Sequence, residues 1–175
     1  LTLKGGRLDG TNTNLNGGAI YNRGGILTLN QCVLTGNYAS NRFQSGGDGY
    51  GGAICSDHAG ASGSTLIINN STISDNEAAT GGGIYNGGSN GIAIIANSTI
   101  SKNVGARGFG GGGFANFDGS LTIDRCDLFD NTAITLYGDG NGGVVYIDGG
   151  SLFMTYSSMF QNRADYGHTI YNKND

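Results

Sequence analysis

The chain has 175 residues, of which 35 are Gly and none is Pro or Trp, and it carries a formal net charge of −4. This length is typical of one domain. The lack of Pro excludes a collagen triple helix, and a charged fraction of 13% is too low for charge-driven disorder. Nine Lys and Arg residues without a basic cluster do not favour a nucleic-acid partner. No apolar run is long enough for a membrane-spanning helix.

A short glycine phrase marks an internal repeat. It reads Gly-Gly-Ala-Ile at residues 17–20 and 51–54, and altered copies stand at 81–84, 111–114, 142–145 and 167–170. In a second phrase, an aliphatic residue or Met is followed by two variable residues and then by Asn. Its copies end at Asn37, Asn76, Asn103, Asn131 and Asn162. Successive copies of the glycine phrase are 25 to 34 residues apart, which indicates a tandem repeat.

Alternating apolar segments between the two phrases predict short strands. They stand at residues 27–29, 66–68, 93–95, 121–123 and 152–154, and their period of two indicates strands. Each repeat thus offers three short strands and cannot bury its apolar face alone. We therefore expect an all-β chain, a single parallel β-solenoid (β-helix) domain over residues 1–175 with about six turns of 25–34 residues. Parallel crossovers are almost always right-handed, so we expect a right-handed solenoid.

Equivalent positions in a stacked solenoid form columns, and three apolar columns are expected to point inward. Their members are Leu3, Leu29, Ile68, Ile95, Ile123 and Met154; then Leu8, Leu34, Ile73, Ile100, Leu128 and Met159; then Ile20, Ile54, Ile84, Phe114, Val145 and Ile170. The Asn residues of the second phrase form a fourth column at a turn, where stacked amides hydrogen-bond to one another. Cys32 and Cys126 share an inward column with Ser residues, and we expect both to be buried free thiols.

The paired phrases, Gly-Gly-Ala-Ile at 17–20 and Leu34-x-x-Asn37 with their copies, resemble the repeats of chlamydial polymorphic outer-membrane proteins. They are also similar to pectin-lyase-like bacterial surface proteins. The Phe of that family's Phe-x-x-Asn phrase is aliphatic or Met in every copy here. The resemblance implies a right-handed β-helix, export to the cell surface or the extracellular space, and a role in adhesion or scaffolding. It also implies surface glycans or a host or matrix protein as partners.

The two ends of the chain are expected to stack on each other. Residues 1–3 match residues 27–29 and the end matches residues 20–25, so the chain closes on nearly a whole number of turns. No charged strand or helix caps either end, and an uncapped turn is a template for another chain. We therefore expect head-to-tail assembly into a filament. The residues expected at the contact are Leu1, Leu3, Leu8, Ile20, Tyr21, Asn22, Met154, Met159, Ile170, Tyr171 and Asn172.

A possible binding surface combines loop residues with an aromatic column. Insertions at 40–50, 106–110 and 134–141 leave from one corner, and Tyr21, Tyr85, Tyr146 and Tyr171 share an outward column broken by Cys55 and Ala115. Loops on one side of a solenoid are the usual partner-binding surface, and aromatic rings stack on sugars. The loop residues concerned are Arg42, Phe43, Tyr50, Arg107, Phe109 and Tyr137.

Catalysis is the alternative function that the resemblance leaves open, because pectin-lyase-like folds include polysaccharide lyases and hydrolases. The best carboxylate cluster is Asp124, Asp127 and Asp130 beside Arg125, with Asp130 in one column with Asp75 and Lys102. We read this column as a surface charge ladder and expect neither catalytic residues nor a metal or other cofactor. The function favoured by the sequence is therefore a non-enzymatic, extracellular, structural or adhesive solenoid, with an adhesin fragment as a further alternative.

Overall fold

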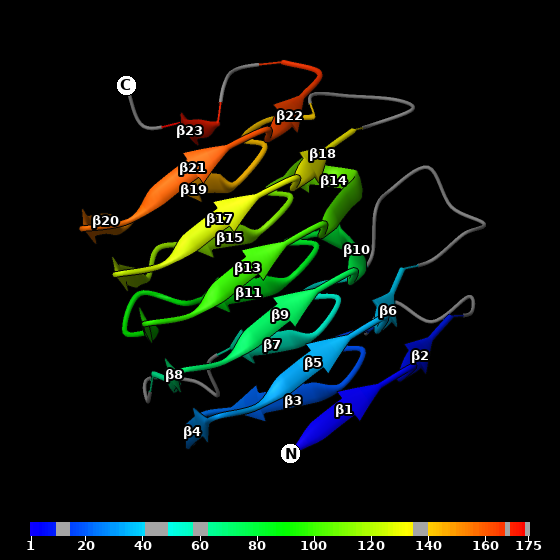
Figure 1. Cartoon of the computed structure of the whole chain (residues 1–175), viewed down its shortest axis with the longest axis vertical. Coiled ribbons are helices and arrows are strands. Elements are labelled where there is room, and N and C mark those ends of the chain that lie inside the picture. The colour runs from blue at the N-terminus through cyan, green and yellow to red at the C-terminus, as the bar shows by residue number, and fades with distance from the viewer. Residues whose placement is uncertain (10–14, 41–48, 58–62, 135–139, 167–168, 174–175) are drawn as a thin grey trace.

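The computed structural model describes residues 1–9, 15–40, 49–57, 63–134, 140–166 and 169–173. Its strands form four parallel sheets, and the chain visits sheets A, B, C and D in that order before it returns to A. Strands of successive visits lie side by side, so the chain winds as a β-solenoid with its N-terminus near one end and its C-terminus near the other (Figure 1). The predicted all-β parallel solenoid is confirmed. Its right-handed winding and its six turns stay predictions.

Sheets A and B follow each other along the chain. Sheet A contains β1 (Thr2–Lys4), β5 (Val33–Thr35), β9 (Thr72–Ser74), β13 (Thr99–Ser101), β17 (Asp127–Phe129) and β21 (Ser158–Phe160). Sheet B contains β2 (Arg7–Leu8), β6 (Tyr38–Ala39), β10 (Glu77–Thr80), β14 (Val104–Gly110), β18 (Thr132–Ala133) and β22 (Arg163–Ala164).

Sheets C and D complete each circuit. Sheet C contains β3 (Ile20–Arg23), β7 (Ile54–Asp57), β11 (Ile84–Gly87), β15 (Phe114–Phe117), β19 (Val145–Asp148) and β23 (Ile170–Asn172). Sheet D contains β4 (Ile26–Asn30), β8 (Thr65–Asn69), β12 (Ile92–Ala96), β16 (Ser120–Asp124) and β20 (Ser151–Thr155).

The structure has four strands per circuit where the sequence predicted three. The sequence did not predict sheet B because most of its strands are only two residues long, and because the residues of its buried column are small except for the exposed Leu8. That column pairs Leu8 with Ala39, Ala39 with Ala78, and Gly105 with Ala133. Small residues at alternate positions do not give the apolar period that identifies a strand.

The predicted register of the first strand is wrong. Leu3 lies beside Leu34 in sheet A, so it does not belong with Leu29, and Leu8 lies beside Ala39 in sheet B, so it does not belong with Leu34. Residues 1–8 therefore match residues 32–39, with Gly5 opposite Gly36 in the turn. The identity of Leu-Thr-Leu at 1–3 and 27–29 misled the alignment, because strands in both sheets use the same apolar alternation.

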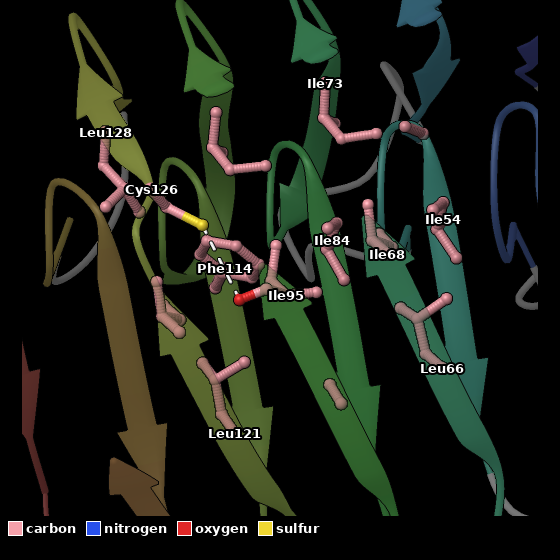
Figure 2. Close-up of a cluster of buried hydrophobic side chains, with 14 of the residues drawn as sticks. Ile54, Leu66, Ile68, Ile73, Ile84, Ile95, Phe114, Leu121, Cys126 and Leu128 are labelled. Atoms are coloured by element: carbon pink, nitrogen blue, oxygen red, sulfur yellow. Dashed lines mark hydrogen bonds between the residues drawn. The ribbon is translucent and has the colours of Figure 1, made fainter. Parts of the chain in front are cut away.

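The other inward columns are as predicted and form one apolar core. Leu34, Ile73, Ile100 and Leu128 are in register along sheet A and have no exposed surface. Figure 2 shows side chains of successive strands pointing into the space that the sheets enclose, with Ile54, Ile84 and Phe114 following one another along sheet C. The Cys126 thiol lies in this core and donates to the Ile95 carbonyl over 3.6 Å (Figure 2). Cys32, Cys55 and Cys126 are all free and buried, as expected for the two that the sequence singled out.

The Asn column forms a continuous hydrogen-bonded ladder through the buried turn between sheets A and B. The backbone N–H and the Nδ2 of Asn76 both donate to Oδ1 of Asn103, over 3.1 and 2.9 Å, and Asn103 makes the same two bonds to Asn131. Each Nδ2 also donates to a carbonyl of the preceding layer, such as that of Ile73. Buried amide groups are thereby satisfied without water, and the predicted amide ladder is confirmed.

The two glycines of the repeated phrase are needed for different physical reasons. Gly51 has a φ of 66°, and its equivalents Gly17, Gly81, Gly111 and Gly142 lie in the same left-handed region, which a Cβ disfavours. Gly52 has an ordinary φ, but a Cβ there would overlap the carbonyl oxygen of Gly82 and the backbone of Glu77 in the next layer. The first glycine therefore permits the turn, and the second permits the close stacking of layers at that corner.

Candidate functional site

The structure places every predicted assembly residue at one of the two ends of the solenoid. Leu1 and Leu3 lie at β1, Leu8 on β2, and Ile20, Tyr21 and Asn22 on β3, all in the first layer. Met154 lies on β20, Met159 on β21, and Ile170, Tyr171 and Asn172 on β23, which are the last strands of their sheets.

Both ends expose the cross-section of the apolar core. The hydrophobic residues that pack against the core but are only partly buried all lie in or beside terminal strands. They are Leu3, Ala19, Ile20 and Leu27 at one end and Leu152, Met154, Met159 and Ile170 at the other. Their counterparts in the middle layers, such as Ile100, have no exposed surface. Within the described residues, no segment covers either end.

The corrected register changes how two ends could meet. Among the described residues, sheets A, B and C have six strands and sheet D has five, so no described strand follows β20 in sheet D. A copy stacked with its first strands on β21, β22 and β23 would leave a gap of one strand in sheet D. Basic residues would also meet, since Arg7 and Arg163 occupy the two ends of one sheet B column. Arg23 and Lys173 do the same in sheet C.

The predicted Tyr column and two of the loop residues form one aromatic layer over sheet C. Tyr21, Cys55, Tyr85, Ala115, Tyr146 and Tyr171 are in register, as predicted. The ring of Tyr50 lies 4.7 Å from that of Tyr85, and Phe109 lies 5.8 Å from Phe117 and 6.3 Å from Tyr146. Phe117, which no sequence pattern had indicated, contacts Tyr85, Phe109 and Tyr146.

This layer is largely closed. The Tyr146 side chain is 2% exposed and stacks on Tyr171 at 5.7 Å, whereas Phe109 above it is 53% exposed. Lys173 pairs with Asp148 at 2.7 Å and also lies 5.9 Å from the centre of the Phe109 ring. A ligand would therefore meet the Phe109 ring and the Lys173–Asp148 pair first, and the Tyr146 ring only if Phe109 moved.

Burial under this layer raises the pKa of two ionisable groups. The pKa of the Cys55 thiol lies well above its ordinary value, first because the thiol is buried and second because the Asp57 carboxylate is near. The pKa of Tyr85 is raised for the same two reasons in the same order. Both groups are therefore neutral and unreactive at neutral pH, which favours a packing role.

The outer face of sheet D is a second exposed surface, and the sequence reasoning did not identify it. Its first outward column is Ile26, Thr65, Ile92, Ser120 and Ser151, and its second is Thr28, Ile67, Ile94, Thr122 and Phe153. Ile26 is 79% exposed and Phe153 64%. Two outward β-branched positions on each of the first three strands, at Ile67 and Ile94 above all, were the signal in the sequence.

The predicted carboxylate cluster is not gathered into one group. Asp124 pairs with Arg125 at 2.5 Å and accepts from the Thr155 hydroxyl, while Asp127 on sheet A accepts from the Ser158 hydroxyl. Asp130 lies in the next turn at a φ of 56°, in one column with Asp75 and Lys102, which share this backbone conformation. Across the described part of the chain, no three His, Cys, Asp or Glu side chains could hold one metal ion.

Some predicted surface residues lie outside the described residues, namely Arg42, Phe43 and Tyr137. Arg107 lies on β14, which runs beside β10, and only its backbone is described. Tyr50 bridges Asn16 and Thr80 just before a glycine phrase.

Comparison with known proteins finds no relative. No protein-family model, no curated protein and no solved structure matches the chain. Among the described residues, no helix is long and apolar enough to cross a membrane.

Proposed function

We propose that this protein is a structural β-solenoid that extends end to end, with the last strands of one copy pairing with the first strands of the next. The observation that supports the proposal is the exposed core at both ends. Leu3 and Ile20 lie at the edge of the core at one end, and Met159 and Ile170 lie at its edge at the other end. The columns that end in these residues run unbroken through the molecule, so a second copy would continue them. An unpaired strand edge above an apolar cross-section is a template for another chain.

The junction is expected to pair three sheets and to respond to salt. Sheets A, B and C meet strand on strand, and the one-strand gap in sheet D weakens the contact. Arg163 meets Arg7, and Lys173 meets Arg23, although Arg7 and Lys173 already pair with Asp9 and Asp148. Because salt screens repulsion between exposed charges, assembly is expected to strengthen as salt increases.

An extracellular or surface location, and adhesion to glycans or to a host or matrix protein, are part of the same proposal. This location and these partners are supported by the resemblance of the repeated phrases to those of chlamydial polymorphic outer-membrane proteins. The structure adds one candidate contact for such a partner, the exposed Phe109 ring beside Lys173 and Asp148. No specific observation favours the alternative of a polysaccharide-cleaving enzyme.

Electron microscopy of the purified chain over a range of protein and salt concentrations tests the assembly. We expect filaments that lengthen with salt, and we expect Met159→Asp to abolish them because the charge would be buried in the junction. Phe160→Asp is the matched control, since its side chain is 46% exposed on the same strand and its neighbour across the junction would be Lys4. Particles that stay dispersed under all conditions, or filaments that tolerate Met159→Asp, would overturn the proposal.

A further inference from the structure

The outer face of sheet D differs from the rest of the surface in its lack of charge. Among the outward positions of its five strands, Asp124 alone is ionisable, and it already pairs with Arg125 at the edge of the face. Ile92 and Ile94 are 42% and 39% exposed, beside the more exposed Ile26 and Phe153. An almost uncharged face on a regular sheet, with exposed apolar side chains at its centre and at both ends, indicates a contact surface.

The large and small residues along this face are ordered so that the same face of a second copy, with its strand order reversed, would fit against it. In the second outward column the small Thr28 stands at one end and the large Phe153 at the other, with Ile94 in the middle. In the first column Ile26 and Ser151 stand at the ends, with Ile92 in the middle. When each column is turned end for end, the large end residues Ile26 and Phe153 face the small residues Ser151 and Thr28, and the middle residues Ile92 and Ile94 face their own counterparts.

We propose that two copies pack sheet D against sheet D, related by a twofold axis that runs parallel to the strands and passes between the two β12 strands. This operation reverses the order of the strands but keeps the position along each strand. Thr28 of one copy then faces Phe153 of the other, Ile26 faces Ser151, and Ile94 faces its own counterpart. At the edge, the Asn69 amide faces the Asp124 carboxylate, a donor opposite an acceptor.

A hollow beside the face supports this arrangement. It has a volume of about 350 Å³ and is lined by residues 89–92 and 118–120, Gly150 and Ser151. The twofold operation brings Ile26, the most exposed aliphatic side chain of the face, against the Ser151 side of this hollow. The other simple twofold axis, parallel to the solenoid axis, would instead place Phe153 on Phe153 and Ile26 on Asn30.

The size of the face predicts a weak dimer. Five strands at about 4.8 Å and five residues at about 3.3 Å cover roughly 400 Å² per copy, or roughly 800 Å² in total. Stable interfaces bury about 1,200–2,000 Å², so a single pair is expected to associate at about 0.1–1 mM. This inference does not depend on end-to-end assembly, although filaments would pair more tightly through many such faces at once.

Sedimentation velocity from about 20 μM to 1 mM tests the dimer. We expect Ile94→Glu to lower the association constant at least about tenfold, because the twofold axis brings each introduced carboxylate against its own copy. Val33→Glu is the matched control, since Val33 is an outward β-branched residue of sheet A with 37% exposure. Met159→Asp separates the two contacts, because it lies outside the face and is expected to leave this dimer unchanged while it abolishes filaments.

A charge pair tests the proposed axis. We expect Thr28→Lys and Phe153→Glu each to weaken the dimer, and the double variant to recover it and become sensitive to salt. Under the other twofold axis the double variant would bring like charges together and weaken association further. A wild-type chain that stays monomeric up to 1 mM, an unaffected Ile94→Glu variant, or a double variant that fails to recover would each overturn the proposal.

Discussion

At the scale of single residues, the Asn ladder supplies buried side-chain hydrogen bonds from layer to layer. Asn103 accepts from Asn76 and donates to Asn131 and to the Ile73 carbonyl, and all of these groups are buried. At the first layer the position is occupied by Gly6, whose N–H donates to Asn37. Because a glycine has no Nδ2 donor, the first layer gives Asn37 one hydrogen bond where Asn37 itself gives two to Asn76.

Removing a central member of the ladder is expected to destabilise the fold strongly. Asn103→Ala leaves buried donors of Asn76 and an acceptor of Ile73 without partners, at about 1–3 kcal/mol each. We expect its free energy of unfolding to fall by about 3 kcal/mol or more in urea titrations. Asn162→Ala at the half-buried end of the ladder is the control, with an expected loss of about 1 kcal/mol. Equal losses for the two variants would contradict the role assigned to burial.

The ladder could be predicted from the sequence because one residue type recurs at one position of every repeat. The donors and acceptors of its hydrogen bonds could not be predicted, since Asn at a turn equally well hydrogen-bonds its own backbone. Leu3 shows the opposite case. A three-residue strand in the first layer has a neighbouring strand on one side only. Its register can therefore be compared with a single repeat, and the repeated Leu-Thr-Leu favours Leu29 over the true neighbour, Leu34.

At the scale of elements, the aromatic layer shows how strands of two sheets cooperate. Tyr85 and Tyr146 come from sheet C, whereas Phe109 comes from β14 in sheet B, which extends toward the corner between the two sheets. The sequence identified both groups separately but did not bring them together. Their contact depends on the path of the chain around the corner, which no periodicity records.

Cys55, Cys126 and Tyr85 predict a loss of stability in alkaline solution. Their pKa values are raised in the folded protein, so above their ordinary values of 9.0 for Cys and 10.0 for Tyr the unfolded chain loses protons that the folded chain keeps. Stability is therefore fully present below about pH 9 and declines as the pH rises further.

Urea unfolding midpoints between pH 7 and pH 11 measure this decline. Cys55→Ala removes one of the groups and introduces the residue that Ala115 already provides in the same column. We expect the variant to match the wild type near pH 7 and to show a shallower decline above pH 9. A decline of unchanged slope would exclude Cys55 as a contributor.

At the scale of the whole molecule, each layer contacts only the layers beside it. The pairings run from each strand to its equivalents one circuit before and one after, with no pairing across the enclosed core. Stability in such a fold is a sum over neighbouring layers, so the ends, which have one neighbour, are the weakest parts.

Native-state hydrogen exchange is expected to follow this gradient. Amides of β9, β12 and β13 in the middle should exchange about 100-fold more slowly than those of β1, β2, β22 and β23 at the ends. The comparison is cleanest within one column, between Ile100 and the terminal residues Leu3 and Met159. Uniform protection along each sheet would show instead that the solenoid opens in one step. In an end-to-end filament the gradient should flatten.

The path of the chain through the four sheets also bears on how the chain folds. Because the path passes from sheet D to sheet A one layer further on, the layers are not closed rings but one continuous ramp. A stack of rings must nucleate each new ring on a flat face, whereas a ramp always ends in a ledge. Each strand that folds onto the ledge meets both the layer below and the strand before it. Growth from a formed nucleus can therefore proceed strand by strand, in step with the emergence of the chain during synthesis.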